Sequence, residues 1–198
     1  FGPITLCDAN ASPAKIAAEV KGFDLDDYVE GGKVLARHTP RPSQMALAAA
    51  LLALHDAELD VNLMSESMGL YVGTSLANLE TTFAMRDRWQ AAGVLPAHAA
   101  FQTFPHSIAC QVSALLDLRG PLHTTTSGCN SGVDALGLAL RQVQSGTVDA
   151  MLVIGVDCEV VPEILAALNA ASALTTRFKD DPGRAARPFV RARDGDRV

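Results

Sequence analysis

Apolar positions along the chain alternate between short continuous runs and runs with helical spacing. The continuous runs predict buried strands at 68–74, 122–127 and 150–156. The helical spacing predicts helices at about 44–56, 77–90, 107–116, 130–145 and 162–170. Strands that alternate with helices are typical of an α/β fold with a partly parallel sheet.

Glycine and proline divide the remaining sequence into loops. Residues 7–44 are predicted to form loops and short pieces, 91–105 a loop rich in Gly, Pro and Ala, and 175–188 a polar surface loop. The predicted helix at 130–145 has an apolar stripe, and Gly146 follows it as a C-cap. The stripe consists of Val133, Leu136, Leu140 and Val143.

Length and charge narrow the possible classes of protein. A chain of 198 residues that is 48% hydrophobic is long enough for one domain with a real core. Its net charge of −6 argues against nucleic acid or an anionic membrane as the main partner. The longest apolar run, Met45–Leu54, is too short to span a bilayer, and the first residues lack the pattern of a signal peptide. We therefore expect a cytoplasmic protein.

The four cysteines are far apart in the sequence and form no Cys-x-x-Cys pair, so no metal site is predicted. Cys110 falls inside a predicted helix and Cys158 follows a predicted strand, positions at which cysteine usually serves packing. Asp157 and Glu159 follow the same strand, at the end where α/β proteins often place functional groups. A solvated loop edge is the favoured interpretation for these two acidic residues.

Cys129 is the strongest candidate for chemistry in the chain. It lies in Thr-Thr-Thr-Ser-Gly-Cys-Asn-Ser-Gly (124–132), between a predicted strand and an apolar helix. Unpaired N–H groups and the positive end of the helix dipole favour the thiolate, which is the nucleophilic form. Gly128 allows a sharp turn, Gly132 keeps the first helical turn slim, and the Cys129 N–H is placed to donate to an oxyanion. The alternative interpretation is a small buried cysteine in a tight turn.

An ordered series of short motifs surrounds Cys129. Arg119-Gly120-Pro121 is followed by Thr-Ser-Gly-Cys-Asn-Ser-Gly-Val-Asp at 126–134 and by Ser-Gly-Thr-Val-Asp-Ala-Met-Leu-Val-Ile-Gly at 145–155. The series continues with Ser-Ala-Leu-Thr-Thr-Arg at 172–177, Arg187-Pro188-Phe189 and Arg193-Asp194-Gly195. It resembles the nucleophile region of β-ketoacyl synthases, above all the ketosynthase α subunits of type II polyketide systems. Gly-Leu-Tyr-Val-Gly-Thr at 69–74 resembles the second strand of that family.

The resemblance implies a thiolase-like α/β fold, layered αβαβα in the complete enzyme, with residues 1–198 as an N-terminal half that is incomplete at both ends. It implies an acyltransferase of polyketide or fatty acid biosynthesis, in which Cys129 accepts an acyl group from the phosphopantetheine arm of an acyl carrier protein. A malonyl-carrier protein is then decarboxylated, and its carbanion attacks the acyl-cysteine in a Claisen condensation. No permanently bound cofactor is implied.

The resemblance also assigns residues for substrate and partner contacts. Phe-Pro-His-Ser-Ile at 104–108 resembles the stretch that lines the acyl pocket and approaches the dimer partner. It implies Ile108 and Phe104 as substrate-binding residues, with core packing as the alternative for Ile108. The strand at 122–126 resembles the edge strand that pairs across a two-fold axis, which implies a homodimer or a ketosynthase-like heterodimer.

Parts of the family pattern are missing from these 198 residues. The family's first strand is absent, and so is the second half, which supplies two histidines and a lysine of the active site. We therefore expect the chain alone to be inactive. Val190 stands where the family usually has Asp, and Asp196 where it usually has Phe, which leaves the C-terminal boundary open.

Three alternative classes of protein fit the sequence less well. A hydrolase-like elbow needs Gly-x-nucleophile-x-Gly, whereas Gly128 directly precedes Cys129 and Gly132 lies three residues beyond it. A non-catalytic partner resembling a chain-length factor usually lacks the cysteine. Another thiolase-fold acyltransferase that uses coenzyme A is disfavoured by the sequence around Arg187-Pro188-Phe189.

Overall fold

The computed structural model describes residues 1–158, 160–187 and 189–191. The chain divides into two compact units. One unit is Asp24–Cys158, and the other combines Phe1–Phe23 with the segment that follows Cys158.

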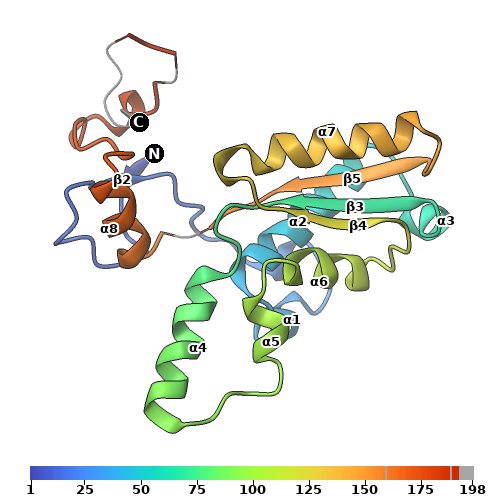
Figure 1. Cartoon of the computed structure of the whole chain (residues 1–198), viewed down its shortest axis with the longest axis horizontal. Helices are drawn as coiled ribbons and strands as arrows, with labels where there is room; N and C mark the ends of the chain where they lie inside the picture. The colour runs from blue at the N-terminus through green and yellow to red at the C-terminus, as the bar shows by residue number, and fades with distance from the viewer. Residues whose placement is uncertain (159, 188, 192–198) are drawn as a thin grey trace. The chain divides into compact units, whose positions relative to one another are not determined.

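A parallel sheet forms the centre of the Asp24–Cys158 unit (Figure 1). Its strands are β4 (Leu122–Thr125), β3 (Met68–Gly73) and β5 (Ala150–Gly155), in the spatial order β4-β3-β5. Both neighbouring pairs are parallel. Every residue of the middle strand β3 is buried, as its continuous apolar run predicts. The three predicted strands are confirmed, each ending one or two residues earlier than expected.

Helices cover both faces of this sheet (Figure 1). α7 (Ser131–Gln144) packs on one face, whereas α2 (Arg41–Asp56) and α6 (Ser107–Leu115) pack on the other. All three helices lie where the periodicity predicts them. α2 begins three residues earlier than expected, because Pro42 fits the first helical turn, where its missing N–H removes no hydrogen bond.

The other helices of this unit are shorter or lie away from the sheet. α4 (Leu79–Ala92) confirms the helix predicted at 77–90. α5 (Ala99–Thr103) lies in a segment predicted as a loop, and a helix of this length is too short to give a clear periodic signal. The remaining short elements are η1 (Leu25–Asp27), α1 (Gly32–Ala36) and α3 (Val61–Met64).

The residues of α7 that are fully buried against the sheet are small, and Leu138 is partly buried beside them. Its buried residues are Ser131, Ala135 and Ala139. The apolar stripe identified in the sequence is exposed, at 70% for Val133, 58% for Leu136, 55% for Leu140 and 40% for Val143. The helix is therefore confirmed, and the apolar stripe predicted for it lies on the exposed side of the helix.

The other unit is built from short elements. β1 (Gly2–Pro3) pairs antiparallel with β2 (Ile16–Ala17). α8 (Pro162–Ala170) has the bounds that the sequence predicts. The expected surface loop at 175–188 contains one 3-10 turn, η3 (Pro182–Arg184), and Pro188 lies outside the described residues.

Glu19 holds the N-terminal segment of this unit with its carboxylate. It accepts hydrogen bonds from the Thr5 amide at 2.8 Å, the Thr5 hydroxyl at 2.7 Å and the Leu6 amide at 3.0 Å. Lys21 Nζ lies 3.4 Å away, and the Glu19 side chain is only 1% exposed. Burial by itself would raise the pKa of Glu19, but these hydrogen bonds favour the ionised form and hold the pKa at about 2.

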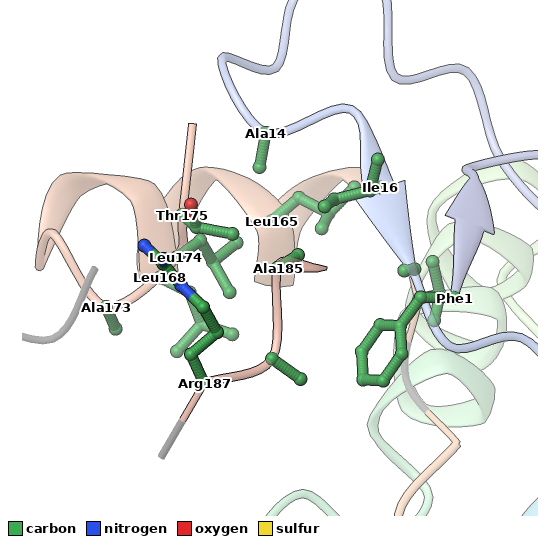
Figure 2. Close-up of a pocket in the computed structure, with 13 residues that line it drawn as sticks. Phe1, Ala14, Ile16, Leu165, Leu168, Ala173, Leu174, Thr175, Ala185 and Arg187 are labelled. Carbon is green, nitrogen blue, oxygen red and sulfur yellow. The ribbon is translucent and has the colours of Figure 1, made fainter. Parts of the chain in front are cut away.

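The same unit contains an apolar pocket of about 440 Å³ (Figure 2). Its wall includes Leu165 and Leu168 of α8 and Ile16 of β2, together with Leu174 and Phe1. In Figure 2, Phe1 lies at one side of the pocket and Leu174 and Thr175 lie at the other. In the described part of the chain, no helix has the length and apolar character needed to cross a membrane.

Candidate active site

Three functional segments meet at one edge of the parallel sheet. Cys129 follows β4, the loop at 74–78 follows β3, and Asp157 follows β5. Because all three strands are parallel, their carboxyl ends share this edge, where open α/β sheets usually place their binding sites. The geometry of this edge therefore decides what Cys129 can do.

Cys129 lies in a short 3-10 turn, η2 (Gly128–Asn130), directly before α7. Gly128 has φ of 72°, a left-handed conformation that favours glycine, so the expected sharp turn at Gly128 is confirmed. The hydroxyl of Ser131 accepts from the Ser127 amide at 2.9 Å and donates to the Gly128 carbonyl at 2.6 Å. Ser127 also donates through its own hydroxyl to the carboxylate of Asp134. Hydrogen bonds of Ser127 and Ser131, the residues before and after η2, thus hold the turn that carries Cys129.

Cys129 is an exposed residue, and it forms no disulfide. Its backbone N–H belongs to the first turn of η2, where the helix's own hydrogen bonding provides no acceptor. A thiol and an N–H presented together by one turn can attack a carbonyl and stabilise the resulting oxyanion. The alternative interpretation of Cys129 as a buried packing residue does not fit this exposure.

Glycines under the first turn of α7 bring the helix close to the strands. Gly73 and Gly155 are register partners at the ends of β3 and β5. A Cβ atom on Gly73 would overlap the backbone of Ser131, so this position has no room for any side chain. A Cβ on Gly132 would lie 3.5 Å from the Gly155 Cα, an ordinary contact. The critical glycine for this close approach is therefore Gly73, which sequence reasoning did not single out, since its cause is a helix far away in the sequence.

Phe104 and Ile108, the predicted substrate-binding residues, lie at the N-terminal end of α6. This end of α6 is at the same edge of the sheet as Cys129, because α6 runs back toward the start of β4, and it is on the opposite face from α7 (Figure 1). Phe104 is 51% exposed and stacks on His106, with ring centroids 5.7 Å apart. Ile108 is fully buried, which favours the core packing noted above as its alternative role.

Asp157 makes specific contacts, which the favoured interpretation of it as a solvated loop residue does not predict. Its carboxylate is exposed but accepts hydrogen bonds from the Thr74 hydroxyl at 2.9 Å and from the amides of Ser75 and Leu76, at 2.9 Å and 2.8 Å. An acidic residue directly after a strand is the only signal for this role in the sequence. Glu159, the other acidic residue noted there, lies outside the described residues.

The other cysteines differ from Cys129 in their surroundings. Cys110 is exposed on α6, so the prediction that it serves packing is wrong. The buried side of α6 is formed by Ile108, Ala109 and Val112 together with Ser107. Cys158 is half-buried, with its Sγ 3.2 Å from the Sδ of Met45, in line with the packing predicted for it. Within the described ranges, no group of three or more His, Cys, Asp or Glu side chains is arranged to hold a metal ion.

The C-terminal motifs can be followed only in part. Arg187 is described, and its guanidinium lies over the ring of Phe178 at 4.3 Å from the centroid. Phe189 and Val190 are described and exposed. Pro188, the Arg-Asp-Gly motif at 193–195 and Asp196 lie outside the described residues.

Comparison with known proteins identifies the family. The chain matches the family described as "Beta-ketoacyl synthase, N-terminal domain" over residues 5–195, and it belongs to that family. It is 31% identical over 195 residues to the 3-oxoacyl-[acyl-carrier-protein] synthase 2 of Staphylococcus aureus, an alignment that covers 97% of this chain and 47% of the relative. The protein of the same name from Synechocystis is 32% identical over 200 residues, covering 98% and 47% of the two chains. The chain thus spans about half the length of the curated relatives it matches.

Solved structures confirm the thiolase-like α/β fold. A β-ketoacyl synthase from Burkholderia phymatum superposes with a TM-score of 0.79 at 28% identity, covering 95% of this chain and 47% of the other. The ishigamide ketosynthase/chain length factor has the same fold, with a TM-score of 0.74 at 24% identity over 87% of this chain and 43% of that one. The family and fold expected from the motifs around Cys129 are therefore confirmed.

Proposed function

We propose that the intact protein is a β-ketoacyl synthase that catalyses decarboxylative Claisen condensation, with Cys129 as the residue that holds the acyl group. The reaction would join an acyl thioester to a malonyl unit in fatty acid or polyketide biosynthesis. The observation that carries this proposal is the exposed Cys129 thiol on a fixed turn at the carboxyl edge of the sheet, in a chain of the ketosynthase family.

The chemistry requires a nucleophile that also leaves readily. A thiolate attacks a thioester, and the new acyl-cysteine thioester remains reactive toward the malonyl-derived carbanion. We propose that the Cys129 N–H donates one hydrogen bond to the oxyanion formed in each of these steps. Its place in the first turn of η2 supports this role.

An acyl carrier protein is the partner we propose for substrate delivery, through its phosphopantetheine arm. The relatives are named 3-oxoacyl-[acyl-carrier-protein] synthases, and that name supports the same partner here. We propose no permanently bound cofactor or metal for the reaction and a cytoplasmic location for the protein. Phe104 is proposed to contact the acyl chain from its exposed position, and Ile108 is proposed to bind substrate as part of the pocket wall behind Phe104.

Residues 1–198 are proposed to be an N-terminal half that neither condenses nor decarboxylates by itself. Two observations support this: the relatives are about twice as long, and α7 leaves four large apolar side chains exposed. We also propose a dimer, with β4 as the pairing strand, since β4 is an edge strand of the described sheet. The partner is a second copy or a ketosynthase-like subunit. Release of CO₂ from malonyl-carrier protein by the isolated chain, above background, would contradict the proposed inactivity.

The nucleophile is tested by mass spectrometry of the intact protein. Incubation with an acyl carrier protein that carries an acyl group should add one acyl group to the wild type and none to Cys129→Ala. Cys110→Ala is a matched control, because Cys110 is also exposed and should remain irrelevant to acylation. An adduct that persists in Cys129→Ala, or one that is lost in Cys110→Ala, would refute the assignment. Absence of any adduct in the wild type would instead favour a non-catalytic partner subunit.

A further inference from the structure

Asp157 lies at the start of a continuous series of contacts that leads from the end of β5 to α6. Its two carboxylate oxygens bind the loop that follows the middle strand β3, through the Thr74 hydroxyl and the Ser75 and Leu76 amides. Asp157 is 80 residues or more from each of these partners in the sequence. The contact therefore joins the ends of two neighbouring parallel strands at the edge that holds Cys129.

The loop held by Asp157 has an unfavourable backbone. Ala77 has φ of 52°, a left-handed conformation that costs energy for any residue other than glycine. Its amide donates to the Thr74 hydroxyl at 2.9 Å, and that hydroxyl is the same one that donates to Asp157. Thr74 and Ala77 are both buried, at 0% and 4% exposure. Asp157 and Thr74 thus hold a strained turn in one conformation.

The turn positions Asn78 so that it contacts the stretch before α6. Asn78 is the N-cap residue of α4, but its side chain makes no capping hydrogen bond. Its Nδ2 instead faces the Phe104 carbonyl oxygen at 3.5 Å, a long hydrogen bond, and the same oxygen accepts from the Ser107 amide at 3.0 Å. A flipped amide would place two acceptor oxygens together, so this orientation is the favourable one.

A second contact joins the same two segments. The Thr82 hydroxyl, one turn into α4, lies 3.0 Å from the Asn78 carbonyl oxygen and 3.4 Å from the Thr103 carbonyl oxygen. One hydroxyl proton is shared between these acceptors, so this contact supports the link through Asn78 without replacing it.

Stability alone does not explain this arrangement. Asn78 is 1% exposed, and its Oδ1 has no hydrogen-bond partner among the described residues. A buried acceptor without a partner and a left-handed alanine are both unfavourable, and natural proteins keep such features mainly at functional sites. Here both features lie on the path from Asp157 to Phe104–Ile108.

We infer that Asp157 is a positioning residue for the acyl pocket: through the loop at 74–78 and Asn78, it fixes the segment Phe104–Ile108 and so sets which acyl chains the enzyme accepts. This inference rests on the proposed function for its consequence in catalysis, although the structural link can be tested separately. Asp157 itself touches neither thiol nor acyl chain in this account. Its effect should appear in acyl-donor selectivity, with the reactivity of Cys129 unchanged.

The structural link is tested by hydrogen–deuterium exchange on the intact protein, which requires no activity. Asp157→Asn keeps the side-chain volume but replaces an accepting oxygen by an NH₂ group. It should speed exchange about tenfold in 74–78 and also in the peptide that contains 104–108. Thr74→Val, which removes the shared hydroxyl, should do the same, whereas Thr74→Ser should behave like the wild type. Faster exchange at 74–78 with no change at 104–108 would overturn the inference.

The functional consequence is tested with two donors, an acyl carrier protein loaded with a short acyl chain and the same protein loaded with a long one. Asp157→Asn and Asn78→Ala should each change the ratio of kcat/KM for the two donors about tenfold, mainly through KM, and the double variant should be no worse than either single variant. Alkylation of Cys129 by iodoacetamide should keep its wild-type rate. An equal loss of kcat/KM for both donors would overturn the inference. So would a double variant whose loss of kcat/KM is the product of the two single losses. If the wild type itself forms no acyl adduct, the proposed function fails, and the exchange experiment still decides the structural link.

Discussion

The two faces of the central sheet are covered by helices that use opposite kinds of side chains. On one face, α6 buries Ile108 and Val112 completely. On the other face, α7 buries Ala135 and Ala139 and leaves Val133, Leu136, Leu140 and Val143 exposed. An apolar stripe along a segment thus predicts a helix but does not say which side of that helix meets the sheet.

The difference follows from how closely each helix approaches the strands. Gly73 lets the backbone at Ser131 lie directly against β3, and the fully buried residues farther along α7 are the small Ala135 and Ala139. Partly buried Leu138, Met151 and Val153 pack around these two alanines and Tyr71. A helix that is apolar on its outer side as well is typical of a layer covered on both sides. The exposed stripe of α7 therefore supports the proposal that the complete protein adds a further layer.

The largest effect should come from breaking the close approach of α7. Gly73→Ala places a Cβ inside the backbone of Ser131, and neither the strand nor the helix has a flexible side chain that can move away. We expect a loss of about 3 kcal/mol or more in the free energy of unfolding, and a lower rate of Cys129 acylation because the η2 turn shifts. Denaturant unfolding and adduct formation measure the two effects.

Gly132→Ala is the control for that substitution. Its Cβ would lie at ordinary contact distance from Gly155, and alanine favours the helix over glycine. Its free energy of unfolding should stay within about 1 kcal/mol of the wild type. If the two variants are equally unstable, the close approach at Gly73 is not what determines the packing of α7.

The next largest effect is expected from truncating a large side chain, and it should differ between the helices on the two faces of the sheet. Ile108→Ala removes a fully buried side chain and should lower the free energy of unfolding by about 3 kcal/mol. Leu136→Ala, on the exposed stripe, should cost less than about 0.5 kcal/mol in the isolated chain. In the intact protein the same change should cost about 2 kcal/mol or more, because a further layer would cover Leu136. A negligible cost in both proteins would contradict the proposed covering of α7.

The N-terminal segment is held by the charged carboxylate of Glu19 as well as by packing. The pKa of Glu19 is lowered from 4.5 to about 2 in the folded unit, so its contribution to stability is complete above pH 4.5 and is lost as the pH falls toward 2. Glu19→Gln should lower the free energy of unfolding of that unit by about 2 kcal/mol near neutral pH and should reduce its sensitivity to acid. The protection factors of the Thr5 and Leu6 amides, which correct exchange rates for the intrinsic effect of pH, measure this between pH 5 and pH 2. The protection factors in the buried strand β3 should stay unchanged over the same range, and a parallel loss of protection in β3 would show that Glu19 is not the cause.

The sequence predicted the parts of the fold that depend on local pattern. The strands at 68–73 and 150–155 and the helix at 162–170 follow from apolar runs and spacing within each segment. The turn at Gly128 and the family follow from a motif around Cys129. Each of these features is determined by neighbours in the sequence, so a single segment contains the information.

The features that could not be predicted depend on contacts between distant segments. The critical role of Gly73 comes from Ser131, the role of Asp157 comes from Thr74 to Leu76, and the long link from Asn78 to Phe104 joins two loops. The exposure of Cys110 depends on which side of α6 meets the sheet. No periodicity or motif in one segment specifies its partner in another, so these required the structure.

The smallest effect should come from Gly137→Ala, and its sign distinguishes the isolated chain from the intact protein. Gly137 lies in the middle of α7, and a Cβ there would meet nothing within 4 Å. In the isolated chain, alanine should therefore raise the free energy of unfolding by about 0.5–1 kcal/mol through helix propensity alone. In the intact protein, a further layer packed on α7 would meet the new methyl group, so the gain should vanish or become a loss. Thermal unfolding of both proteins measures the difference, and an equal gain in both would mean that the outer side of α7 stays in solvent around Gly137.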